Sequence, residues 1–118
     1  MLACGKTEVH PALTEAEAAI RRDLSGSTYD SAVRDAVEQR RWWLREWEAG
    51  APYVLGLLAQ DVQEAVHLDD PNWPLCIETS CPARRAHALF VAPDLGRDPF
   101  WTCDRTGLPV APVGSLCG

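Results

Sequence analysis

The sequence predicts an α+β fold, in which a helical hairpin or a three-helix unit is followed by a small β-hairpin module. Three observations support this class. Apolar residues recur at three- and four-residue intervals from about residue 14 to residue 66, which is the period of a helix. After residue 72, prolines, cysteines and short apolar runs replace that pattern. The 118 residues suit one compact domain.

The helical region reads as two or three helices. A capping box, T-E-A-E at 14–17, predicts the start of the first helix, and S-G-S at 25–27 predicts its end. A second helix is expected to begin at residue 27 or 28 and to end at Gly50, because glycine suits the position after a helix. Pro52 fits the first turn of a third helix, where its missing N–H costs nothing.

The chain divides into an N-terminal segment (1–13), the helical region (14–70), a module containing cysteines (71–110) and a tail (111–118). Within the module, the apolar runs "HALFVA" and "FWTC" predict two strands, and "PDLGRD" between them suits a hairpin loop. Beyond Gly107 the stretch "LPVAPVGSLCG" contains two prolines, and we expect it to be extended at most.

Three cysteines of the module predict a metal site. Four residues separate Cys76 from Cys81, a spacing that lets one turn present two thiolates to a tetrahedral ion. A hairpin brings its ends together, so Cys103 should return to Cys81 in a zinc-ribbon-like arrangement. The fourth ligand stays open between His87, if it pairs directly opposite Cys103, and Cys117, if the tail folds back. The expected cofactor is a structural zinc ion.

The motifs "CIETSC" at 76–81 and "WTCDRTG" at 101–107 resemble a group of small actinobacterial and actinophage zinc-ribbon-like proteins. In that group C-x4-C and a short hairpin precede an aromatic residue and C-D-R-H-G. The resemblance covers about a quarter of the chain and implies a structural zinc site held by the three cysteines. Thr106 stands where the group has its histidine ligand, which implies a lost site or a relocated fourth ligand.

Two other readings of the cysteines remain open. Free cysteine is among the most buried residue types, so the thiols could be reduced core residues without a metal. In an exported lipoprotein Cys4 would be lipidated, and disulfides such as Cys76–Cys81 and Cys103–Cys117 could form. The chain as written has no charged and apolar leader before Cys4, so we expect a cytoplasmic protein, in the host cytoplasm or in a virion if it is phage-encoded.

The stretch "RRWWLREWEAG" predicts an interaction surface. Trp43 and Trp47 lie four residues apart on the apolar face of the helix, whereas Trp42 points elsewhere. A large exposed aromatic is better stabilised when it is covered, either by the tail or by another protein. Tryptophan and arginine dominate binding hot spots, so Arg40 and Arg41 join the three tryptophans as candidate interaction residues.

These patterns favour a small non-enzymatic protein that binds another protein or a second copy of itself. Two arginine pairs, 40/41 and 84/85, are the only candidates for phosphate contacts, and a net charge of −6 disfavours nucleic-acid binding as the alternative function. The sequence contains no recognisable catalytic motif. No apolar run approaches the roughly 20 residues that a membrane span requires.

Overall fold

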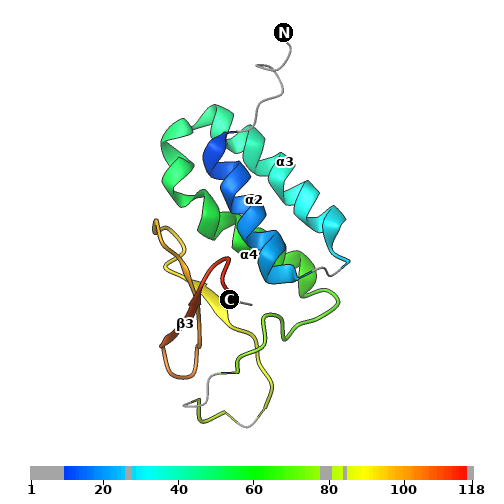
Figure 1. Ribbon diagram of the computed structural model, residues 1–118, viewed down its shortest axis with the longest axis vertical. Helices are drawn as coiled ribbons and strands as arrows, with labels where there is room; N and C mark the ends of the chain where they lie inside the picture. Colours follow the sequence, from blue (N-terminus) through cyan, green and yellow to red (C-terminus); the bar gives the residue numbers. More distant parts are fainter. Residues whose placement is uncertain (1–9, 26–27, 78–80, 84, 117–118) are drawn as a thin grey trace.

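The computed structural model describes residues 10–25, 28–77, 81–83 and 85–116. Three α-helices pack together in one half of the molecule, and a three-stranded antiparallel sheet lies against one end of this bundle (Figure 1). The α+β class predicted from the sequence is therefore confirmed. Within the described ranges, every helix is too short or too polar to traverse a bilayer.

Helix α2 (Pro11–Leu24) begins earlier than the capping box predicts. Its N-cap is His10, whose Nδ1 accepts a hydrogen bond from the backbone N–H of Ala12 at 3.0 Å. Thr14 instead lies in the first turn and donates its hydroxyl to the carbonyl of His10. Glu17 pairs with Arg21 one turn later. The expected capping box is therefore wrong, because histidine supplies the acceptor one turn earlier.

Helix α3 (Asp30–Glu46) is followed by the 3₁₀ turn η1 (Glu48–Tyr53) and by α4 (Val54–Val66). The second helix therefore starts two or three residues later than expected and ends before Trp47. Gly50 is not a helix cap: it lies in η1, where an added Cβ would come within 2.4 Å of the Trp43 ring. The close approach of that indole, rather than a left-handed turn, explains the glycine.

The helices bury one continuous apolar core. It is formed by side chains at the three- and four-residue spacing read from the sequence: Leu13, Ile20, Val33, Val37, Leu44, Leu58, Val62 and Val66. The sheet adds Trp101, which is fully buried and packs edge-on against Trp73 with ring centroids 5.4 Å apart. The helices and the sheet therefore share a core rather than forming two separate ones.

The sheet has the order β1-β2-β3, formed by Phe90–Ala92, Phe100–Thr102 and Pro109–Pro112. The predicted hairpin is confirmed as β1 and β2. Strand β3 was not predicted, because the segment that contains its two prolines was expected to be extended at most. Both prolines are tolerated because β3 lies at the edge of the sheet, where a missing N–H breaks no ladder hydrogen bond on the open side.

The buried carboxylate of Asp23 joins α2 to the sheet and to the segment that follows β3. This side chain is only 4% exposed. Its Oδ2 accepts hydrogen bonds from the indole N–H of Trp101 at 2.8 Å and from the backbone N–H of Gly114 at 2.6 Å. Its Oδ1 accepts the backbone N–H of Leu116 at 3.0 Å. Three donors thus compensate for the burial of one charge.

Candidate metal centre

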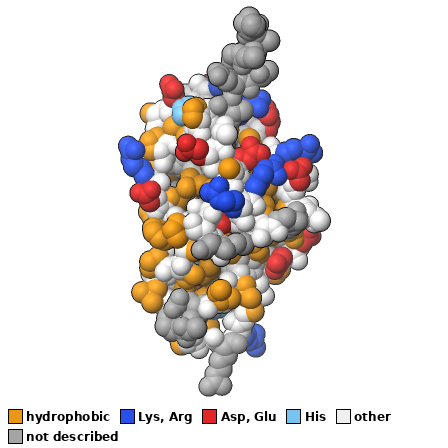
Figure 2. All heavy atoms as spheres, in the orientation of Figure 1, with side chains coloured by type: hydrophobic (Ala, Val, Ile, Leu, Met, Phe, Trp, Pro, Cys, Tyr) orange, Lys and Arg blue, Asp and Glu red, His pale blue; other side chains and the backbone are white. Residues whose placement is uncertain are grey.

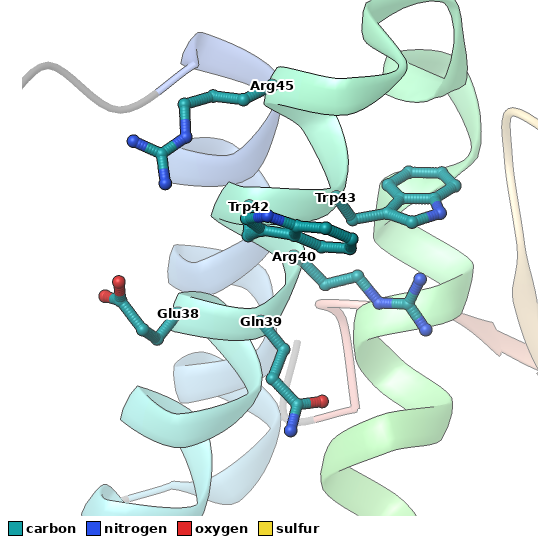
Figure 3. Close-up of a pocket in the computed structure, with 6 residues that line it drawn as sticks. All are labelled: Glu38, Gln39, Arg40, Trp42, Trp43 and Arg45. Carbon is teal, nitrogen blue, oxygen red and sulfur yellow. The ribbon is translucent and has the colours of Figure 1, made fainter.

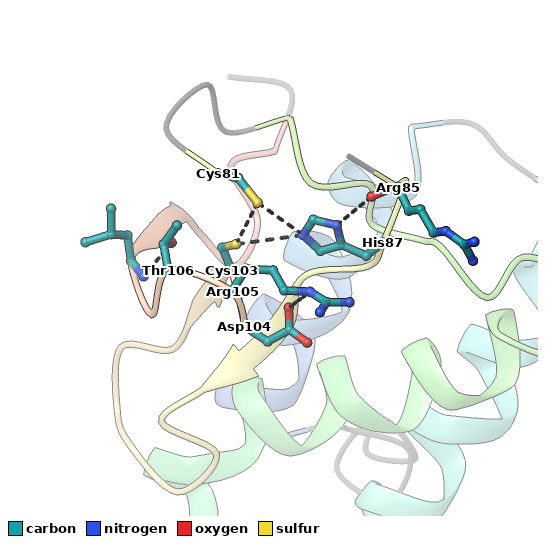
Figure 4. A network of polar contacts seen from close by, with 8 residues as sticks. Cys81, Arg85, His87, Cys103, Asp104, Arg105 and Thr106 are labelled. Carbon is teal, nitrogen blue, oxygen red and sulfur yellow. Dashed lines mark hydrogen bonds and ion pairs between the residues drawn. The ribbon is translucent and has the colours of Figure 1, made fainter. Parts of the chain in front are cut away.

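Four elements deliver the metal-ligating side chains to one place. Residues 74–76 run antiparallel to 87–89, with Leu75 opposite Ala88 and the N–H of Cys76 bonded to the carbonyl of His87 at 2.9 Å. This pairing extends the sheet beyond β1 and places Cys76 beside His87. Cys103 follows β2 directly, and Cys81 reaches the same point from the loop before His87 (Figure 4).

The distances within this cluster match a tetrahedral site. One ligand atom from each of Cys76, Cys81, His87 and Cys103 lies within 4.8 Å of all the others. The Sγ atoms of Cys81 and Cys103 are 3.6 Å apart, and the Nε2 of His87 lies 3.6 Å and 3.8 Å from them. A zinc tetrahedron with bonds of about 2.3 Å to sulfur and about 2.0 Å to nitrogen has edges of roughly 3.6–3.8 Å. The four side chains could therefore hold a metal ion.

His87 is the fourth member of the cluster, but not by the register the sequence suggested. Phe90 pairs with Thr102, so the continuation of this ladder places Leu89, not His87, opposite Cys103. His87 lies beyond the ladder, where its chain is held by the pairing with Cys76. The other candidate for the fourth ligand, Cys117, lies outside the described residues.

The hydrogen bonds of His87 orient it as a ligand. Its Nδ1 lies 3.0 Å from the carbonyl oxygen of Arg85, and because that oxygen can only accept, Nδ1 carries the proton. Nε2 faces the sulfurs of Cys81 and Cys103 (Figure 4), so it can donate its proton to a thiolate or, once it has lost that proton, offer its lone pair to a metal ion. A backbone carbonyl that fixes the tautomer of a metal-binding histidine is a common outer-shell arrangement.

The local electrostatics favour a thiolate at Cys103. The hydrogen bond with His87 is the main influence that lowers the pKa of Cys103 to about 6, against the opposing effect of burial. The hydroxyl of Thr106 and the backbone N–H groups of Thr106 and Arg105 contribute further hydrogen bonds to the sulfur. The bond to the Arg85 carbonyl, followed by the one to Cys103, raises the pKa of His87. A thiol that releases its proton readily is suited to metal binding.

Thr106 supports Cys103 rather than replacing a ligand. The turn from Cys103 to Leu108 is closed by backbone bonds from Gly107 to Cys103 and from Cys103 to Leu108, with Gly107 at φ 74°. Thr106 Oγ1 accepts the N–H of Leu108 at 3.2 Å and donates to the sulfur of Cys103. Thr106, where the sequence comparison suggested a histidine, therefore supplies a hydroxyl that hydrogen-bonds the sulfur of Cys103.

Replacing Thr106 with valine keeps the shape of the side chain but removes its hydroxyl. We expect the Thr106→Val protein to bind zinc at the same stoichiometry, with an affinity lowered about 10- to 100-fold, the usual effect of losing an outer-shell partner. Competition with a chromogenic chelator measures this change. Thr106→Ser, which retains the hydroxyl, is the matched control and should stay within about threefold of the original chain. Equal affinities for the valine and serine proteins would contradict this role.

Among the described cysteines, Cys76, Cys81 and Cys103 form no disulfide. The Cys76–Cys81 disulfide considered for an exported protein is therefore absent from the structure. The alternative pairing of Cys103 with Cys117 involves a residue outside the described ranges, as does the lipidation of Cys4. Cys103 is fully buried, as expected for a core thiol, but its sulfur faces the cluster.

The tryptophan-bearing helix presents only part of the predicted surface. Trp42 is 59% exposed, so none of the described segments, including the part of the tail before residue 117, covers its indole. Trp43 is half-buried and turns toward α4 (Figure 3). Trp47 is 49% exposed, and its ring contacts the Trp43 ring edge-on with centroids 5.3 Å apart. It follows the last residue of α3, so it does not lie on the apolar face of that helix as predicted.

The arginines near Trp42 are engaged within the chain. The guanidinium of Arg40 binds the carboxylate of Asp61 on α4 through two hydrogen bonds, of 2.6 Å and 3.0 Å, and lies 5.1 Å from the centroid of the Trp43 ring. Arg41 lies 3.7 Å from the carboxylate of Glu38. Arg84 is outside the described residues. Arg40 therefore links two helices and is poorly placed to contact phosphate or a partner.

Charged and apolar side chains are unevenly distributed over the surface. On the face shown in Figure 2, charged groups gather over the helical half, whereas apolar groups gather over the sheet half. Positive and negative groups are interspersed, so this face has no extended basic surface. The sequence did not single out Glu38, Gln39 and Arg45, which line a hollow of about 540 Å³ beside Trp42 (Figure 3).

Comparison with known proteins gives one match. The model of a family described as a domain of unknown function, DUF8819, matches residues 9–113. No curated protein gives a significant match, and no solved structure does so either. The matched range includes every described helix and strand together with all four members of the metal cluster. The chain therefore belongs to the DUF8819 family.

Proposed function

We propose that this chain is a zinc-stabilised protein-interaction module without a catalytic role of its own. The observation that carries the proposal is the convergence of three thiols and one imidazole within 4.8 Å of one another, with Cys81, Cys103 and His87 at the edge lengths of a zinc tetrahedron. Zinc is favoured because soft sulfur ligands combined with imidazole in a tetrahedral arrangement are typical of its structural sites.

The composition of the site supports a structural rather than a catalytic ion. Catalytic zinc sites keep one coordination position for water or substrate, whereas structural sites use four protein ligands. Cys76, Cys81, His87 and Cys103 would supply all four. The ion would then join the segment before β1 to the end of β2 and contribute directly to the free energy of folding.

The interaction role rests on Trp42. An indole that is 59% exposed leaves a large apolar area in water, and aromatic residues of this kind are enriched in the centres of protein interfaces. Nucleic-acid binding is less well supported, because Asp61 neutralises Arg40 and the chain carries a net charge of −6.

The zinc part is tested by metal analysis of protein purified without chelators or nickel resin. The expected result is about one zinc per chain, released together with reactive thiols. Protein that contains no metal and folds equally well in the presence of a chelator would contradict the proposal.

The interaction part is tested by a photo-crosslinking amino acid at position 42, introduced in cells of the organism that encodes the chain. We expect crosslinked protein adducts from position 42. The control places the same probe at Ser31, which is also exposed on α3 but lies three turns away. Equal labelling from both positions, or none from position 42, would contradict an interface at Trp42.

A further inference from the structure

We infer that the exposed face of α3 binds a second copy of this chain, with the two helices antiparallel and related by a two-fold axis at Trp42. This inference names the partner of the proposed interaction surface and therefore rests on it. Its evidence is the order of apolar and charged groups along the face, which is complementary to itself when the helix is reversed.

The centre of the face is apolar and hollowed. Trp42 stands at the middle of the exposed stripe of α3, and the hollow of about 540 Å³ lies beside its indole (Figure 3). In a two-fold arrangement, each copy presents both an indole and a hollow. The indole of one copy can therefore enter the hollow of the other, and both rings lose their exposure to water at once.

On one side of Trp42, a negative and a positive side chain lie at similar distances from it along the helix axis, in opposite directions. Glu38 precedes Trp42 by four residues and Arg45 follows it by three, which places them about 6.0 Å and 4.5 Å away along the helix axis in opposite directions. Both side chains lie on the same side of Trp42 (Figure 3). A two-fold axis perpendicular to the helix preserves that side and reverses the direction, so Glu38 of each copy meets Arg45 of the other.

The other flank follows the same rule. Gln39 precedes Trp42 by three residues and Glu46 follows it by four, so the reversal places each glutamine amide beside the glutamate of the other copy. An amide N–H can donate to that carboxylate. The symmetric interface would thus contain two ion pairs and two hydrogen bonds around the paired indoles. A parallel arrangement, whose two-fold axis runs along the helices and exchanges the two sides, would instead place Glu38 beside Gln39 and Arg45 beside Glu46.

The groups required for this pairing are available. No carboxylate of the described residues lies within ion-pair distance of the Arg45 guanidinium, and Glu38 is approached only by Arg41, at 3.7 Å. Both side chains are exposed. Oppositely charged groups fix the register of an interface more than they add to its affinity, so the charges would set the register of the pairing while Trp42 supplies most of the affinity.

Sedimentation equilibrium of the full chain with zinc, from about 1 μM to about 500 μM, tests the inference. The original chain should dimerise, and Trp42→Ala should weaken the dimer at least about tenfold with an unchanged circular dichroism spectrum. Glu38→Arg and Arg45→Glu should each weaken it about tenfold or more, because each creates two like-charge contacts. Arg34→Glu, a charge reversal on α3 two turns from Trp42, should leave the dimer unchanged.

Mixing the two charge variants provides the decisive result. Glu38→Arg protein carries two positive groups on the flank and Arg45→Glu protein carries two negative groups, so an equimolar mixture should form a heterodimer at least as tight as the original dimer. No recovery in the mixture would overturn the antiparallel pairing. A chain that stays monomeric throughout would overturn self-association, and adducts with another protein at position 42 would then leave the proposed function intact.

Discussion

Cys81→Ser protein is expected to lose its zinc and most of the stability of the fold. Four-ligand structural sites bind zinc with apparent free energies of roughly 10–16 kcal/mol at neutral pH, which is comparable to the typical net stability of about 5–15 kcal/mol for a whole domain. Since the ion would join the segment before β1 to the end of β2, we expect a loss of at least about 4 kcal/mol in unfolding free energy. Urea unfolding monitored by circular dichroism, together with metal analysis, measures both losses.

The metal-free original chain is the control for this variant. Serine differs from cysteine by one atom, so without zinc the two proteins should unfold within about 1 kcal/mol of each other. The difference between them should appear only when zinc is present. A Cys81→Ser protein that keeps its zinc and its stability would show that Cys81 is not a ligand and would contradict the four-ligand site.

Asp23→Ala should be the most damaging change outside the metal cluster. It removes the acceptor for the N–H groups of Trp101, Gly114 and Leu116, and the hydrogen bonds to the first two are buried. Each lost bond to a charged group costs about 1.5–3 kcal/mol, and the effects are not fully additive. We expect a loss of about 3–5 kcal/mol in unfolding free energy, measured by urea unfolding with zinc bound.

Two further variants separate hydrogen bonding from simple loss of a side chain. Asp23→Asn keeps one acceptor oxygen, which can still serve Trp101 and Gly114, but places an amide donor against the N–H of Leu116, so it should destabilise by about 1–3 kcal/mol. Asp35→Ala removes an exposed carboxylate from α3 and should change stability by less than about 0.5 kcal/mol. A similar effect of all three changes would contradict a specific role for Asp23.

The sequence predicted the buried faces of the helices well, because burial sets the spacing of apolar residues. It predicted the helix ends less well, because these depend on capping. Val33, Leu58 and Val62 lie at helical spacing because one face of each helix is buried, and this spacing is visible in the sequence. The start of α2 was missed because His10 acts as the cap, and histidine is rarely expected there. Strand β3 was missed because its prolines are acceptable only at a sheet edge, which is a property of the assembled sheet.

The metal cluster was predictable as far as its cysteines. The spacing of Cys76 and Cys81 and the hairpin before Cys103 are local features, and the structure brings all three together. The place of His87 depends on the pairing of residues 74–76 with 87–89, which is not encoded in any short motif. The function of Thr106 likewise follows from a turn that exists only after Cys103 has been positioned.

The hydrogen bonds of Asp23 also bear on when the fold can form during synthesis. Its partners follow it by 78, 91 and 93 residues. While the ribosome is still translating residues 25–100, α2 can coil and begin to pack, but its carboxylate has none of these donors and remains hydrated. The first helix of the fold is therefore completed last, after residues 101–116 emerge from the exit tunnel. Truncation before Gly114 would leave this helix with a charge that it cannot bury.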